Sequence, residues 1–163
     1  MHPSGEPSVH PSVERVTREL TAQGATGEVR TLDDAARTAA QAAAALGVEV
    51  AQIANSLVFD ADGAPLLVLA SGGHRVDTAK VATLVGAQQV DRATPEFVRE
   101  HTGFTIGGVA PVAHSTPLTT LVDVALADYD EIWAAAGHSH TVFRTTYDEL
   151  VRITGGQPAE VGA

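Results

Sequence analysis

Residues 53–70 read Ile-Ala-Asn-Ser-Leu-Val-Phe-Asp-Ala-Asp-Gly-Ala-Pro-Leu-Leu-Val-Leu-Ala. Two apolar runs, residues 53–59 and 65–70, flank the turn-forming stretch of residues 60–63. We predict that the runs are paired antiparallel strands, because Asp/Gly sequences between apolar runs are typical of hairpins. Their nearly continuous apolar character indicates a sheet that is covered on both faces.

Helix signals surround this hairpin. Residues that can cap a helix start precede apolar runs with helical spacing at Ser12, Thr31, Asp77, Thr94 and Thr146. We expect the helix after Thr31 to cover residues 33–46, and Thr146 with Glu149 to form a capping box for the last helix. Residues 118–124, 132–136 and 141–143 read as further strands. Strands and helices alternate without a repeated unit, which favours an α/β (α+β) fold with a mixed β-sheet surrounded by helices.

Composition restricts the class of protein. The chain has 163 residues, 44% of them apolar, which suits one domain with a real core. We expect this domain over residues 11–157, a flexible tail over residues 1–10 and a frayed end over residues 158–163. There is no cysteine, no secretory signal pattern and no apolar run long enough for a membrane span, so a cytoplasmic protein is the default.

The net charge argues against general affinity for nucleic acid. Twenty acidic residues against ten basic ones give a formal charge of −10. Binding to DNA or RNA relies on Lys and Arg that neutralise phosphates. We therefore expect no DNA partner, and any contact with RNA must be weak and local.

A glycine-rich loop over residues 102–114 is the strongest candidate for a binding loop. It contains Gly103, Gly107, Gly108 and Pro111. Glycines let a ligand approach the main chain closely, and such a loop can aim N–H groups at an oxyanion or a carbonyl. A tight turn between two elements is the alternative interpretation.

The spacing Gly107-x-x-x-Pro111, entered through Thr-Gly-Phe, resembles the substrate loop of the YbaK-like family, which includes the editing domain of bacterial prolyl-tRNA synthetases. Other stretches fit that family in order, and the resemblance spans about residues 11–157. The stretches that fit the family are residues 52–59, residues 73–80, Ala136-Gly137, residues 148–150 and residues 154–156.

The resemblance implies a compact, curved mixed sheet and a trans-editing deacylase. Such an enzyme hydrolyses the ester of a wrong, small amino acid, such as Ala or Cys on tRNA-Pro. It implies that the backbone of Gly107 and Gly108 holds the ester carbonyl. The substrate-binding residues that it implies are Ser56, Gly103, Phe104, Ile106, Val109, Pro111, His114, Gly137 and His138. The implied partners are the tRNA acceptor end and a tRNA synthetase.

Asn55 departs from the family pattern. Relatives usually have a lysine before the hydroxyl residue here, and that lysine is important for deacylation; this chain has Asn55 before Ser56. Asparagine can hydrogen-bond but carries no charge. Asn55 is therefore either a weakened catalytic residue or an ordinary polar strand residue. The alternative function is a non-catalytic family member that binds a small amino-acid-like ligand or a partner protein.

Other polar residues carry weaker signals. His138 and His140 could share one face of a strand, but a zinc site normally needs at least three protein ligands, so we predict no metal and no cofactor. Lys80 is read as a surface partner of Asp77 in preference to a phosphate contact. Glu149 is read as a helix-start residue in preference to an acid–base catalyst, and Trp133 as core in preference to a stacking platform.

Overall fold

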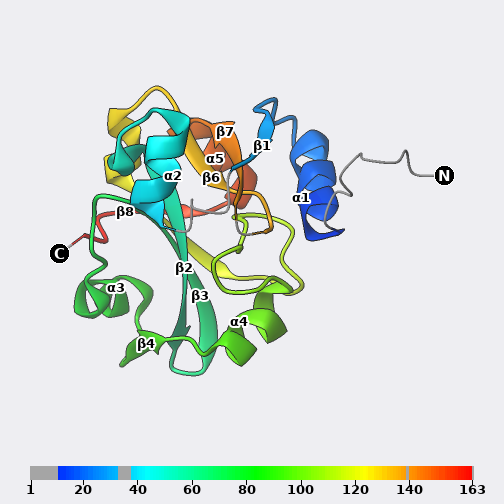
Figure 1. The fold of residues 1–163 in the computed structure, drawn as a ribbon. Coiled ribbons are helices and arrows are strands. Elements are labelled where there is room, and N and C mark those ends of the chain that lie inside the picture. The colour runs from blue at the N-terminus through cyan, green and yellow to red at the C-terminus, as the bar shows by residue number, and fades with distance from the viewer. Residues whose placement is uncertain (1–10, 33–37, 139, 163) are drawn as a thin grey trace.

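The computed structural model describes residues 11–32, 38–138 and 140–162. Its strands are β1 (Val29–Thr31), β2 (Ile53–Ala61), β3 (Ala64–Ser71), β4 (Val90–Arg92), β5 (Thr119–Asp123), β6 (Ile132–Ala135), β7 (Thr141–Thr145) and β8 (Gln157–Ala159). Its α-helices are α1 (Pro11–Ala22), α2 (Ala39–Leu46), α3 (Thr78–Val85), α4 (Pro95–Thr102) and α5 (Tyr147–Thr154). The strands form one mixed sheet in the order β1-β7-β6-β2-β3-β5-β8, with β4 beside β2 (Figure 1).

The predicted hairpin is confirmed. β2 and β3 pair antiparallel up to Ala61 and Ala64, so the connecting loop is only Asp62 and Gly63. Both residues have positive φ, +52° and +93°, as this tight turn requires. The strands are longer than expected because pairing continues to Ala61 and Ala64, and Asp60 accepts a hydrogen bond from the Gly63 N–H across the turn.

The sheet is covered on both faces, as its apolar strands indicated. Leu67 and Leu69 of β3 pack into the core that includes α1, α4 and α5. Leu66 and Val68 face the other way, into the core under α3, while Ile53 of β2 packs under α2. Figure 1 shows α2 and α3 on one side of the β2–β3 ribbon and α1 and α4 on the other.

Helix starts were only partly predictable. Asp77, Thr94 and Thr146 cap α3, α4 and α5 as expected. Thr31 does not cap α2, because it pairs with Thr141 at the end of β1; Thr38 is the cap and forms a capping box with Gln41. Ser12 is also not a cap, because it lies inside α1. The expected helical residues 33–37 and the tail of residues 1–10 lie outside the described residues.

The C-terminal segment differs from the expected frayed end. β8 pairs with β5 in parallel, and Val161 is fully buried. The Lys80 ammonium donates to the Gly162 carbonyl oxygen at 2.8 Å, so this lysine anchors the chain end. The segment is ordered because its apolar side chains complete the core under α3.

Two of the remaining alternatives are also decided by packing. Trp133 is buried against α2 and is a core residue. Glu149 lies in the first turn of α5, but its carboxylate accepts a hydrogen bond from the Thr145 hydroxyl at 2.6 Å, so only the Thr146 half of the expected capping box forms. None of the described helices is long and apolar enough to cross a membrane.

Candidate functional site

One edge of β2 is interrupted. β3 pairs with β2 along its length, but the other edge pairs with β6 only at Ile53 and Ala54 and with β4 only from Phe59 onward. The Ala93 N–H also reaches the Val58 carbonyl at 3.4 Å. Within the described chain, residues 55–57 therefore have no strand partner on this edge. The sheet opens because parallel β6 diverges from β2 after two paired positions.

Ser56 presents its main chain to this gap. The Ile53 carbonyl accepts from the Gly72 N–H on the β3 side, whereas the Val58 carbonyl faces Ala93 on the opposite side. Because the polar groups of successive strand residues point to alternate edges, the Ser56 N–H and C=O point into the gap. A donor and an acceptor of the main chain are thus available to a ligand.

A small cavity fills the space between the diverging strands, and we call it the edge cavity. Its volume is about 100 Å³, below the roughly 300–1,000 Å³ of sites for drug-sized ligands. Its lining comes from β2, β6, α2, the glycine loop and the turn before β7, and includes Thr38, Asn55, Ser56, Gly107, Val109, Trp133, Ala135, His138 and His140. A cavity of this size suits a small side chain.

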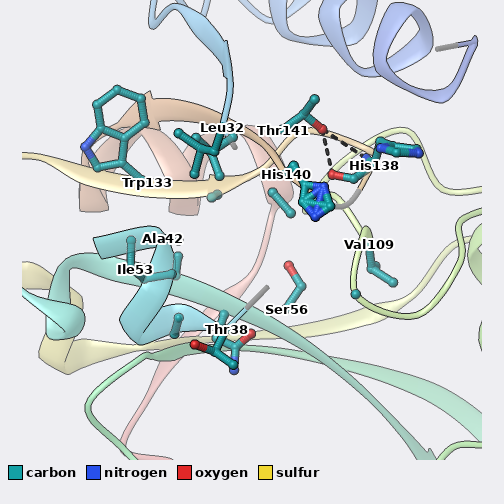
Figure 2. Close-up of a pocket in the computed structure, with 17 residues that line it drawn as sticks. Leu32, Thr38, Ala42, Ile53, Ser56, Val109, Trp133, His138, His140 and Thr141 are labelled. Atoms are coloured by element: carbon teal, nitrogen blue, oxygen red, sulfur yellow. Dashed lines mark hydrogen bonds between the residues drawn. The ribbon is translucent and has the colours of Figure 1, made fainter. Parts of the chain in front are cut away.

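The Ser56 side chain points into the edge cavity. Figure 2 shows its hydroxyl directed from β2 toward the turn that carries His140. Its Oγ is buried and has no hydrogen-bond partner among the described residues. A buried hydroxyl without a partner costs about 1–3 kcal/mol, so this group is poised to bond a ligand.

The opposite wall is a tight turn with two histidines. The Thr141 hydroxyl donates to the His138 carbonyl at 2.6 Å and accepts from the His138 N–H at 3.2 Å (Figure 2). His140 has a positive φ of +73°. His138 and His140 are the ionisable side chains in the described lining, which contains no carboxylate and no lysine. No group of three metal-ligating side chains occurs in the described part of the chain.

A second depression, the side groove, adjoins the edge cavity. The two share the wall made by Asn55, Ser56, Gly107 and Val109. The side groove runs along β2 toward β4 and α4 and has a volume of about 270 Å³. A ligand with a small head and a larger body can therefore occupy both spaces.

The glycine loop contributes one of its two central glycines to these spaces. Gly107 lines both, has a φ of +89°, and leaves open space where a Cβ would be. Gly108 lines neither, and its N–H donates to the Thr105 carbonyl at 3.0 Å. The expectation that Gly108 offers an oxyanion donor is therefore not supported, because its donor closes a turn.

Ile106 and Val109 also border these spaces, whereas Phe104 and His114 make contacts within the protein that stabilise the loop. Phe104 is fully buried beneath the Arg15 guanidinium, which lies 4.5 Å from its ring centre. The His114 Nε2 lies 2.7 Å from the Ala110 carbonyl oxygen, and burial lowers the pKa of His114. Both side chains are used within the protein and do not line the edge cavity.

Three more expected substrate residues lie elsewhere. Gly103 ends α4 with a φ of +77°. Pro111 and His114 border a different depression near α5. Gly137 packs against α1, where a Cβ would lie 2.7 Å from the Ser12 carbonyl oxygen. Gly103 is needed for the left-handed end of α4, and Gly137 is needed for the close approach of α1. Pro111 lies away from the edge cavity.

Sequence reasoning missed part of the lining. Thr38 and Ala135 carry no motif, and His140 was considered only as a metal ligand. They converge because α2, β6 and the turn before β7 meet at the gap in β2. No spacing within the sequence signals that meeting.

The fold and site define a class of protein: a mixed-sheet domain with a small cavity at a gap between the parallel strands β2 and β6, lined by main-chain and hydroxyl groups. Residues 33–153 match the model of the aminoacyl-tRNA editing domain, and the chain belongs to that family.

Solved and curated relatives agree with this membership. A crystal structure of a candidate trans-editing enzyme for prolyl tRNA synthetase superposes with a TM-score of 0.90 and 45% identity, covering 96% of this chain and 99% of that one. The uncharacterized protein YwhH of Bacillus subtilis is 29% identical over 85% of this chain and 88% of its own length. The proline--tRNA ligase of Bacillus licheniformis is 30% identical over 98% of this chain, which spans only 30% of the ligase.

Proposed function

We propose that the protein is a trans-editing aminoacyl-tRNA deacylase that hydrolyses the ester of a small amino acid, such as Ala or Cys, on tRNA-Pro. The observation that carries the proposal is Ser56, whose N–H and unpartnered Oγ face a cavity of about 100 Å³. That volume accepts a small side chain, and family membership supplies the substrate class. Such a reaction belongs to the cytoplasm.

The chemistry requires little beyond positioning and charge stabilisation. The amino-acid side chain would enter the edge cavity, and the ester carbonyl would accept hydrogen bonds from Ser56. Water adds to the carbonyl carbon, and the bond to the ribose oxygen then breaks, that oxygen leaving with a proton. Donors fixed where the oxyanion develops are worth about 10²–10³ in rate each.

Two groups would complete the site. Gly107 would let the ester approach the loop backbone, since a side chain is absent there. His138 and His140 are the ionisable candidates for moving the proton of the attacking water. Asn55 supplies a hydrogen bond and no charge, so the tRNA contact would be weak and local.

Purified protein and a panel of charged tRNAs test the proposal. We expect release of Ala or Cys from tRNA-Pro and no release of proline from the same tRNA. A Ser56→Ala variant purified in the same way is the matched control, because any hydrolysis by a contaminating enzyme would appear equally in both preparations. Equal hydrolysis by wild type and by a no-enzyme blank across the panel would refute the proposal.

A non-catalytic member of the family is the second candidate. The neutral Asn55, where relatives usually have a lysine, favours it. Such a protein would bind a small amino-acid-like ligand in the edge cavity. Calorimetric binding of a non-hydrolysable alanyl ester analogue, without turnover of any charged tRNA, would support this candidate.

A further inference from the structure

The side groove has the features of a site for a nucleotide. It is lined by the open part of β2, residues 55–59, and by Arg92, Val98 and Ile106 among others. It is larger than the edge cavity and continuous with it through shared residues. Whatever is attached to a group in the edge cavity must leave through this groove or directly into solvent.

Ile106 is an exposed apolar side chain at the groove. It is 61% exposed, more than any other large hydrophobic residue in the described chain. It lies one residue before Gly107, which lines both spaces. An apolar side chain held in water beside a binding site is a favourable surface for the face of a base.

Arg92 supplies the positive charge. It is the only Lys or Arg among the described residues that line the edge cavity or the side groove. Its side chain makes no hydrogen bond or ion pair with any described residue, and it is exposed. In a chain with a formal charge of −10, an unused guanidinium at this place fits a phosphate group.

We propose that the side groove binds the 3′-terminal nucleotide of the RNA strand, with the base against Ile106 and the phosphate at Arg92. This inference rests on the proposed function, since the ester in the edge cavity joins the amino acid to that nucleotide. A peptide strand is a poorer occupant: β6 and β4 close both ends of the gap in β2, so only residues 55–57 could pair with it. A single nucleotide needs no such length.

The first experiment uses adenosine 5′-monophosphate as the probe and needs no activity. Amide shifts are followed by NMR in the full chain. We expect shifts at residues 55–59 and 106–107, which weaken in Arg92→Gln and persist in Arg99→Gln. Arg99 is an exposed residue of α4 outside the groove, so its variant matches the change of charge. No shift, or shifts clustered elsewhere, overturns the proposal.

The second experiment measures deacylation of Ala-charged tRNA-Pro. Arg92→Gln should lower kcat/KM about three- to tenfold and reduce the slope of log affinity against log salt by about 0.7–1. Arg92→Lys should restore most of both, and Arg99→Gln should change neither. Ile106→Ser should lower kcat/KM about fivefold, whereas Leu84→Ser, an exposed control on α3, should not.

The outcomes separate this inference from the proposed function. Deacylation that is equal in wild type, Arg92→Gln and Ile106→Ser would refute the nucleotide groove and leave the deacylase standing. Nucleotide binding that depends on Arg92 without any deacylation would refute the deacylase and leave the groove standing. Thermal melts of every variant confirm that each is folded.

Discussion

Replacing Ser56 with alanine should raise stability while lowering activity. The Ser56 Oγ is buried without a partner in the described chain, and such a group costs about 1–3 kcal/mol. Removing it should recover about 1 kcal/mol, which corresponds to a rise in Tm of about 2–4 °C for a domain of this size. The same change deletes a hydrogen-bond donor from the edge cavity. We expect kcat/KM for deacylation to fall about 100-fold, the equivalent of about 2.7 kcal/mol.

Ser71 provides the matched control on the paired strand. Its Oγ donates to the Ala51 carbonyl at 2.8 Å, and the residue is 1% exposed. Ser71→Ala would leave that carbonyl without its partner, so Tm should fall by about 4–8 °C, the effect of about 2 kcal/mol. Ser71 lines neither the edge cavity nor the side groove, so its variant should keep its activity.

Thermal melting and single-turnover deacylation, performed on both variants, decide the matter. Ser56→Ala should raise Tm and lower activity, whereas Ser71→Ala should lower Tm and leave activity unchanged. Together the two variants separate effects on stability from effects on catalysis. A fall in Tm for Ser56→Ala, or unchanged deacylation by it, would refute the idea that this hydroxyl is kept for a ligand.

Three further substitutions test other parts of the structure. Asn55→Lys should raise deacylation, and more at low salt than at high salt, because it adds a cation beside both spaces; an unchanged or lower rate at both salt concentrations would contradict a substrate role for this residue. Gly137→Ala should lower the free energy of unfolding in urea by about 2–4 kcal/mol. The reason is that φ is +106° and the new Cβ would lie 2.7 Å from the Ser12 carbonyl oxygen and 2.9 Å from Val16. An unchanged urea midpoint would show that α1 shifts without cost to make room for the methyl group. Burial lowers the pKa of His114 from its ordinary 6.5, so the unfolded chain binds more protons near that pH, and stability should be full above about 6.5 and fall as the pH drops below it. His114→Gln should lack that part of the decline between pH 7.5 and 5.5; parallel melting curves for the two proteins would be the contrary result.

Local sequence signals predicted the elements that local physics determines. The β2–β3 hairpin followed from two apolar runs and an Asp/Gly turn, and the caps Asp77, Thr94 and Thr146 followed from short-range hydrogen bonding. The Thr31 prediction failed because a threonine that can cap a helix can equally end a strand. Pairing with a segment more than a hundred residues away made the choice.

The candidate site depended on contacts that no local pattern encodes. β4 and β8 are three residues long, too short to show any period, yet β4 sets one end of the gap in β2. The glycine loop was recognisable, but its sequence did not reveal that Gly107 faces the open space while the Gly108 N–H closes a turn. Burial of Phe104 follows from packing against Arg15, which lies on a distant helix.

The parallel pairing of β2 with β6 also has a consequence for synthesis. Ile53 pairs with Trp133, roughly 80 positions later in the chain. At translation rates of about 5–20 residues per second, Ile53 leaves the ribosome about 4–16 s before its parallel partner. Throughout that interval the start of β2 has an edge of unpaired N–H and C=O groups, with which β6 later pairs. The nascent chain thus passes through a stage at which a chaperone would be most useful, and the edge cavity can be assembled only after it.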